Sequence, residues 1–247
     1  MTQAYYNKKA INASLIKEVL KSPQHGYAML NSKPEPTDSM ALGSLVHHLV
    51  LTPSLPFDSF VFAEEGQRFK AAEKEQYARE GKTIVRSYMK AEAESMTRAI
   101  QENTFASDLL NGSMTEEEIY FTTPDGTPCK SKLDARKGGV LIDLKTGSHA
   151  DVKDFARTVV NCDYHTQLAF YRGAMLSAGV EFKQAYIIHV TNAAPYICRV
   201  FRLSDDFLMV GDTRVSDAME TAIQLMEGWK PEQPSKVIEL DLPGWVK

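Results

Sequence analysis

The first fifty residues carry apolar side chains at helical spacing. Asn12 can cap a helix over residues 12–21, in which an apolar stripe recurs every three or four residues and which stops before Ser22-Pro23. A second short helix can restart at Pro23. Residues 37–51 predict a third helix, whose buried face consists of Leu42, Leu45, Val46 and Leu49. The pattern therefore predicts an N-terminal helical region.

A polar stretch follows at residues 64–108. It contains nine acidic and eight basic residues and is interrupted by Gly81. Such a mixture of charges is typical of solvent-exposed helices. We therefore expect two or more solvated helices here, forming a helical annex or lid at about residues 64–110.

From residue 115 the pattern changes from helical to alternating. The runs EEEIYFTT, PCKSKLDAR and GVLIDLKT are typical of strands, and Pro-Asp-Gly and Gly-Gly turns separate them, so they predict an antiparallel meander. Residues 151–160 and 164–178 indicate helices, 184–191 and 196–203 strands, and 205–229 a long amphipathic helix. This order predicts one α/β (α+β) domain over residues 1–247 with a mixed central sheet flanked by helices, and a surface extension at about 230–247.

Composition and charge exclude several classes of protein. The longest uncharged apolar stretch, residues 40–51, is shorter than the ~18 residues of a membrane-spanning helix, and residues 1–12 have no signal-peptide core, so we expect a soluble, cytoplasmic protein. The formal net charge of −4 argues against coating nucleic acid through bulk positive potential, but a nuclease with a carboxylate metal site is compatible with it. Cys129, Cys162 and Cys198 are widely spaced, which favours three reduced thiols over a disulfide framework or a metal cluster.

The turn at Gly138-Gly139 predicts a hairpin that brings carboxylates together. If Lys137 pairs with Val140, the same register places Asp134 opposite Asp143, and Lys132 opposite Lys145. Alternation then puts Asp134, Asp143 and Lys145 on one face, and the opposite, core face consists of Leu133, Val140, Ile142 and Leu144.

Directly opposed carboxylates, with Cβ atoms about 5 Å apart, destabilise a sheet unless a cation lies between them. Oxygen ligands without a cysteine cluster select Mg²⁺ or Mn²⁺. Lys145, about 7 Å along the strand from Asp143, can reach a scissile phosphate or an activated water. The alternative is that Asp134 and Asp143 are ordinary exposed strand residues paired with lysines.

An ordered set of motifs resembles a known nuclease family. Asp134 and, nine residues later, Asp143-Leu144-Lys145 resemble the D…(D/E)-x-K signature of the PD-(D/E)XK nuclease superfamily. With GSLVH at residues 43–47, Glu118 before the hairpin and QLAFY at residues 167–171, the set resembles the RecB-like branch, and most closely the RecE-type phage or prophage recombination exonucleases. The opening SLIKEVLKSPQHGY is also similar to these exonucleases, and the resemblance spans about residues 12–203.

This resemblance implies a restriction-endonuclease-like fold and assigns roles to residues. It implies that His47, Asp134, Asp143 and the Leu144 carbonyl bind the metal, and that Lys145 orients or activates water. Glu118 matches an acidic residue of related exonucleases, but Glu116 or Glu117 could serve instead. His47 could also be a buried core histidine, with His48 as the functional residue.

Two further pairs are candidates for contacting DNA. Gln167 and Tyr171 lie four residues apart on one helix face, where they can bond the metal shell or the DNA backbone, although a helix with a half-buried tyrosine would show the same pattern. Ser14 and Lys17 lie near a helix start, where free N–H groups favour a terminal 5′ phosphate. The alternative for them is a cap-region serine and a solvated lysine.

The resemblance implies a Mg²⁺-dependent deoxyribonuclease, with Mn²⁺ as a substitute, in a bacterial or phage-infected cell. It implies 5′→3′ digestion of linear double-stranded DNA ends to leave 3′ single strands for a single-strand annealing protein, by a homo-oligomer in the form of a toroidal ring. The alternatives are an endonuclease of the same superfamily and a non-catalytic DNA-binding or assembly module.

Overall fold

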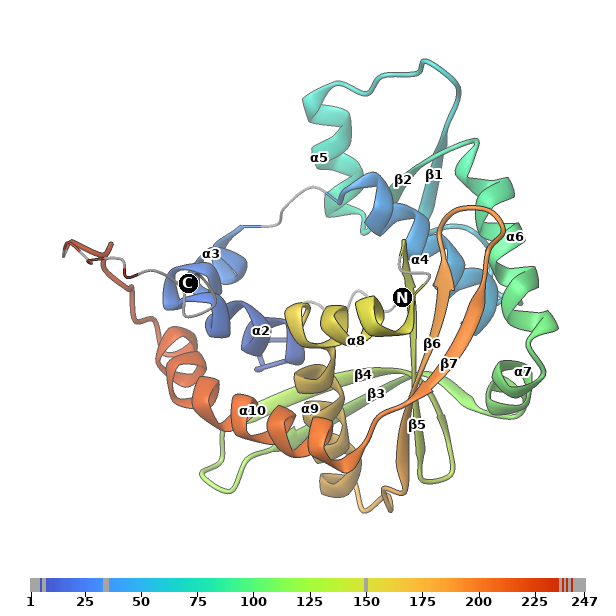
Figure 1. Cartoon of the computed structure of the whole chain (residues 1–247). Helices are drawn as coiled ribbons and strands as arrows, with labels where there is room; N and C mark the ends of the chain where they lie inside the picture. The colour runs from blue at the N-terminus through green and yellow to red at the C-terminus, as the bar shows by residue number, and fades with distance from the viewer. Residues whose placement is uncertain are drawn as a thin grey trace.

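A mixed five-stranded sheet of order β3-β4-β5-β6-β7 lies between layers of helices (Figure 1). The computed structural model describes residues 5, 8–32, 36–148, 151–235, 237, 239 and 241. The strands of the central sheet are β3 (Met114–Thr122), β4 (Pro128–Lys137), β5 (Val140–Gly147), β6 (Gln184–Thr191) and β7 (Cys198–Arg202). The predicted α/β architecture with a mixed central sheet is confirmed.

The N-terminal region forms the three predicted helices, α2 (Ala13–Lys21), α3 (Pro23–Asn31) and α4 (Asp38–Leu51). The Asn12 side chain caps α2 by accepting a hydrogen bond of 2.9 Å from the backbone N–H of Leu15. Ser22 ends α2 and caps α3, and Thr37 caps α4. Short side-chain acceptors at these three positions satisfy amides that the helices leave free, which is why the sequence signals were reliable.

Residues 60–110 depart in part from the prediction. They form β1 (Phe60–Ala63), α5 (Ala71–Arg79), β2 (Thr83–Arg86), α6 (Met89–Glu102) and α7 (Thr104–Leu110), and β1 pairs in parallel with β2. Helix α5 has no buried residue, as expected of a solvated helix. The expectation is wrong for α6, because Met89, Ala93, Met96 and Ile100 are buried. Its charges share the helix with an apolar stripe of helical period, which overall charge content conceals.

The central sheet is completed in the predicted order. Strands β3, β4 and β5 form the antiparallel meander. Strand β6 pairs in parallel with β5, and α8 (Val152–Asn161) and α9 (Tyr164–Ser177) supply the crossover that a parallel pair requires. Strand β7 is antiparallel to β6, and α10 (Asp205–Met226) follows it.

The tail is only partly described. Of the predicted extension at 230–247, residues 230–235, 237, 239 and 241 are described, and nearly all of them are exposed. The other residues of that prediction lie outside the described part of the chain. Within the described ranges, we find no helix of the length and apolar character that crossing a membrane requires.

Strand β5 is covered on both faces, which corrects the prediction of one core face and one open face. Ile142 and Leu144 pack in a cluster with α4 and α6, whereas Leu141 packs with α8 and α9. Leu133, predicted to lie with Ile142 and Leu144, belongs instead to the cluster of Leu141. A strand with helices on both sides buries alternate residues in either direction, so Asp143, which follows Leu141 on the same face, lies beneath helices.

The hairpin register is confirmed next to the turn but not farther along. Lys137 pairs with Val140, and the ladder continues to Ala135↔Ile142, where it stops. The predicted opposition of Asp134 and Asp143 is therefore corrected: an Asp134 oxygen accepts a 2.8 Å hydrogen bond from the backbone N–H of Leu144. The predicted Lys132–Lys145 pair likewise lies beyond the end of this ladder. The Asp134 side chain thus bonds β5 at the point where the two strands separate.

The close contact of α9 with α10 makes a stability prediction. A Cβ added to Gly211 of α10 would lie 2.5 Å from the His165 carbonyl oxygen and 2.8 Å from the Ala169 Cβ of α9. We expect Gly211→Ala to lower the free energy of unfolding by about 1–3 kcal/mol, because the helices must separate. Urea unfolding measures this change.

The matched control is Gly173→Ala in α9, where an added Cβ would meet no other part of the described chain within 4 Å beyond its chain neighbours and its own helix backbone. Because alanine favours helix over glycine, this variant should gain up to about 1 kcal/mol. Equal stability of Gly211→Ala and the unchanged protein would refute close packing at this crossing.

Candidate active site

Strand β5 carries a carboxylate, Asp143, and an ammonium group, Lys145, on the face toward α9. The Asp143 side chain is 1% exposed, and its Oδ2 lies 2.6 Å from the Lys145 ammonium nitrogen. Burial acts to lower the pKa of Lys145, but the carboxylates of Asp143 and Asp134 hold that pKa above its usual value. Lys145 is therefore a fixed positive charge at neutral pH.

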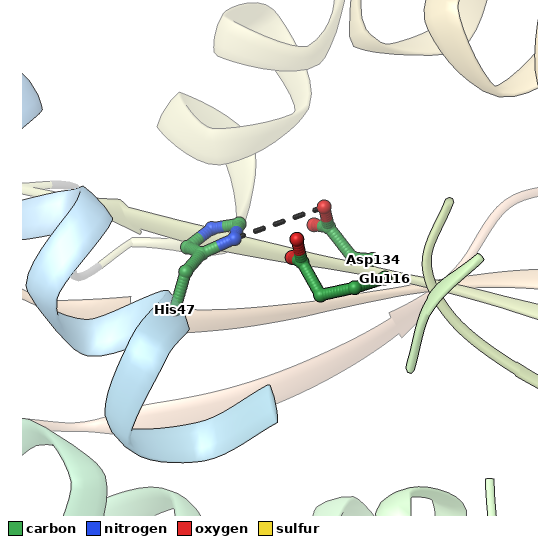
Figure 2. A group of neighbouring side chains, drawn as sticks. All are labelled: His47, Glu116 and Asp134. Atoms are coloured by element: carbon green, nitrogen blue, oxygen red, sulfur yellow. Dashed lines mark ion pairs between the residues drawn. The ribbon is translucent and has the colours of Figure 1, made fainter. Parts of the chain in front are cut away.

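His47 of α4 and Asp134 of β4 both contact β5 at Leu144, the residue between Asp143 and Lys145. His47 Nδ1 lies 3.7 Å from Asp134 Oδ1 (Figure 2). His47 Nε2 lies 2.9 Å from the Leu144 carbonyl oxygen, and since a carbonyl oxygen only accepts, Nε2 is the donor. The structure thus brings together three of the four groups assigned to the metal by resemblance, and Asp143 lies beside them on β5.

The alternative histidine is directed elsewhere. The His48 ring packs against Phe57 and Phe60, with centroid separations of 4.6 and 5.4 Å. Burial lowers the pKa of His48 and favours the neutral imidazole. Of the two neighbouring histidines, His47 is therefore the one that faces the carboxylates.

Glu116 of β3 completes a group of metal-ligand type with His47 and Asp134. Each of the three offers one ligand atom, and these atoms lie within 4.8 Å of one another (Figure 2). Glu116 has a backbone φ of 56°, which is strained for a residue with a side chain inside a strand. Strain of this kind is concentrated at functional sites, so the structure favours Glu116 within the acidic triplet.

The other two glutamates of the triplet are directed to other partners. The Glu118 carboxylate accepts a 2.9 Å hydrogen bond from the Tyr120 hydroxyl. Glu117 accepts two hydrogen bonds, of 2.7 and 2.9 Å, from the Arg136 guanidinium. Glu118, the residue assigned by resemblance, lines the same cleft but stands outside the group around His47. Alternation places Glu116 and Glu118 on one strand face and cannot separate them, because it does not show a local change in φ.

Gln167 of α9 connects the site to the N-terminal helices. Its amide nitrogen donates to Asp143 Oδ1 at 3.2 Å and to the Tyr171 hydroxyl at 3.0 Å. Its amide oxygen accepts a 3.2 Å hydrogen bond from the Lys17 ammonium of α2. Burial raises the pKa of Tyr171 well above its usual value, so it remains a neutral phenol. Gln167, Tyr171 and Lys17 therefore form one hydrogen-bonded group beside Asp143, and their roles toward the metal shell and DNA stay predictions.

Tyr164 is a residue of the site that the sequence analysis missed. The Lys145 ammonium lies 4.9 Å from the centroid of its ring, and the Lys17 ammonium lies 5.7 Å from it. Burial, together with the charge of Lys145, lowers the pKa of Lys17. An aromatic face between two ammonium groups offsets part of their repulsion. The sequence signal that could have identified Tyr164 is its position three residues before Gln167, which places both side chains on one helix face.

A cleft of about 1070 Å³ contains His47, Glu116, Asp134, Lys145 and Gln167. It is lined by residues of α2, α4, β3, β4, β5 and α9. Ser14 lines it as an exposed residue of α2, near Lys17.

The donor set fits a hard divalent cation. His47, Glu116 and Asp134, with the Leu144 carbonyl, offer carboxylate and carbonyl oxygen atoms and one imidazole, all of which are ligand types for divalent cations. Two carboxylates directed at one point repel each other, and a divalent cation there would remove this repulsion.

This geometry predicts which glutamate binds the ion. Glu116→Gln should weaken Mn²⁺ binding at least about tenfold, because an amide is a poorer ligand than a carboxylate. Glu118→Gln is the matched control and should leave Mn²⁺ affinity nearly unchanged. Isothermal titration calorimetry of both purified variants measures the two affinities. If Glu118→Gln weakens Mn²⁺ binding and Glu116→Gln does not, Glu118 is the ligand instead.

Comparisons with known proteins identify the family and the fold of the chain. Residues 12–239 match the family model described as PDDEXK-like domain of unknown function (DUF3799). No curated protein sequence matches the chain. A candidate exonuclease from Eubacterium rectale has a similar structure, with a TM-score of 0.68 at 17% identity over 98% of this chain and 94% of that one. A phage-related exonuclease from Haemophilus somnus 129PT is less similar, with a TM-score of 0.38 at 12% identity over 88% and 95%. The chain therefore belongs to the PDDEXK-like domain family and has the fold of the PD-(D/E)XK nucleases, as its motifs indicated.

Proposed function

We propose that this protein is a Mg²⁺- or Mn²⁺-dependent deoxyribonuclease that digests linear duplex DNA from 5′ ends. The observation that carries the proposal is the convergence of His47, Glu116, Asp134 and Lys145 in one cleft, with Asp143 buried beside them and ion-paired to Lys145. A non-catalytic relative would most simply have lost one of the three signature residues. The description of the Eubacterium rectale neighbour as an exonuclease supports the choice of an exonuclease over an endonuclease.

The chain's own groups have separable roles in this reaction. His47, Glu116, Asp134 and the Leu144 carbonyl would hold the cation, which supplies water activation near neutral pH and positive charge at the phosphate. Asp143, which the family signature also assigns to the metal, lies beside them on β5. The Lys145 ammonium donates to a phosphate oxygen or to the attacking water, and so stabilises charge that develops in the transition state.

Gln167 acts beside these groups. Its amide holds the Asp143 carboxylate in one orientation, and Tyr171 fixes the amide in turn. Attack in line with the 3′ oxygen would release a 5′ phosphate. The resulting 3′ single strand is the substrate that a single-strand annealing protein would bind.

The decisive experiment offers linear and circular DNA together. A 5′-phosphorylated linear duplex and a covalently closed plasmid are incubated with the protein and Mg²⁺ or Mn²⁺. The linear DNA should be lost while the circle persists, and EDTA should stop digestion because the carboxylates need the cation. A 5′ end label should be released before a 3′ label.

Lys145→Ala, purified in parallel, controls for contaminating nucleases. It should bind DNA and metal but show no turnover. Loss of the closed circle at a similar rate would indicate an endonuclease, and persistence of both DNAs with either metal would indicate a non-catalytic module.

The cleft also makes a prediction about the DNA end. Ser14 and Lys17 line the cleft, and Lys17 is near Gln167, so we expect them to hold a terminal 5′ phosphate. The Ser14→Ala/Lys17→Ala variant should lose the preference for 5′-phosphate over 5′-hydroxyl ends, measured as a ratio of initial rates. An unchanged ratio would assign both residues to structure alone, and circular dichroism checks that the variant folds.

A further inference from the structure

Lys132 of β4 is a cation at the edge of the group around His47. It lines the cleft, and its ammonium forms an ion pair with Glu116. Its side chain is 16% exposed. Burial lowers the pKa of Lys132, and the Asp134 carboxylate opposes that effect. An ammonium that is only 16% exposed is costly without an anionic partner.

Glu116 takes part in two interactions that compete for its carboxylate. It is the partner of Lys132, and it is also one of the three residues that offer ligand atoms to a cation. A divalent ion bound by Glu116 and Asp134 would stand close to the Lys132 ammonium, and like charges at such distances repel. The cation and Lys132 therefore compete for Glu116.

We propose that cation binding transfers the Lys132 ammonium from Glu116 to a phosphate oxygen of the bound DNA strand. Metal loading and DNA binding then strengthen each other through this residue. The inference rests on the proposed function, because it takes the cation and the DNA from it. It adds a phosphate-binding site that forms only when the metal site is filled.

Glu118 is the competing destination for the displaced ammonium. It lies opposite Lys132 in the β3–β4 ladder. Its carboxylate already accepts a hydrogen bond from the Tyr120 hydroxyl, which reduces its need for another donor. A DNA phosphate within the cleft brings an unneutralised negative charge, so it is the stronger acceptor.

The first measurement tests competition without DNA. Mg²⁺ is titrated calorimetrically into the unchanged protein, Lys132→Gln, and the control Lys183→Gln, whose lysine pairs with Glu181 outside the cleft. Lys132→Gln should bind Mg²⁺ at least about fivefold more tightly, the lower range of site-to-site coupling. Lys132→Arg, which retains the charge, should behave like the unchanged protein, as should Lys183→Gln. Unchanged or weaker Mg²⁺ binding by Lys132→Gln overturns the competition.

The second measurement tests where the ammonium goes. In a Lys145→Ala background, which prevents cleavage, fluorescence anisotropy follows binding of a short labelled duplex over a series of NaCl concentrations, at one fixed Mg²⁺ concentration or in EDTA. Adding Lys132→Gln should reduce the slope of log affinity against log salt by about 0.9 with Mg²⁺, the value of one phosphate contact. In EDTA the slope should not change.

The remaining outcomes separate the two proposals. An equal loss of slope in both conditions, or no loss in either, overturns the transfer, and the second of these results favours Glu118 as the destination. If the unchanged protein binds no Mg²⁺ and digests no DNA, the proposed function fails together with the inference. If it does both while Lys132→Gln alters neither measurement, the inference alone fails.

Discussion

The burial of the Asp143 carboxylate in the middle of the sheet is the constraint on which the site depends. A buried carboxylate loses its hydration, and only close donors can offset that cost. Lys145 supplies an ammonium at 2.6 Å and Gln167 an amide at 3.2 Å. Because these donors come from β5 and α9, the acid can be retained only where helix and strand are packed together. Stability and chemistry therefore require the same contacts.

The fold supplies this environment by covering both faces of β5. Parallel pairing with β6 needs a crossover, and the crossover helices α8 and α9 lie over the face that bears Asp143. Helices α4 and α6 cover the opposite face, and α4 carries His47 to the end of the hairpin. The strands of the hairpin separate after Ala135↔Ile142, which leaves Asp134 free to bond the Leu144 amide and to face the cleft.

Electrostatic repulsion explains why this edge of the sheet is suited to a cation. Glu116 and Asp134 direct carboxylates toward the same point beside His47, and Glu116 adopts a strained backbone to do so. Lys132 compensates part of this negative charge, and a divalent ion would compensate more of it. A strained backbone and two carboxylates directed at one point occur together here, and strained residues cluster at functional sites.

The sequence by itself determined the features that depend on neighbouring residues. Helix caps, the order of strands, the register next to Gly138-Gly139 and the spacing of the Asp134, Asp143 and Lys145 signature follow from local chemistry and from alternation. The tertiary structure alone decided that Glu116 rather than Glu118 meets His47, and that α6 is buried. Those outcomes depend on a single positive φ, on the point where two strands separate, and on contacts between distant segments. These three features leave no periodic pattern in the sequence, because the interactions that favour them form only when the helices and strands pack together.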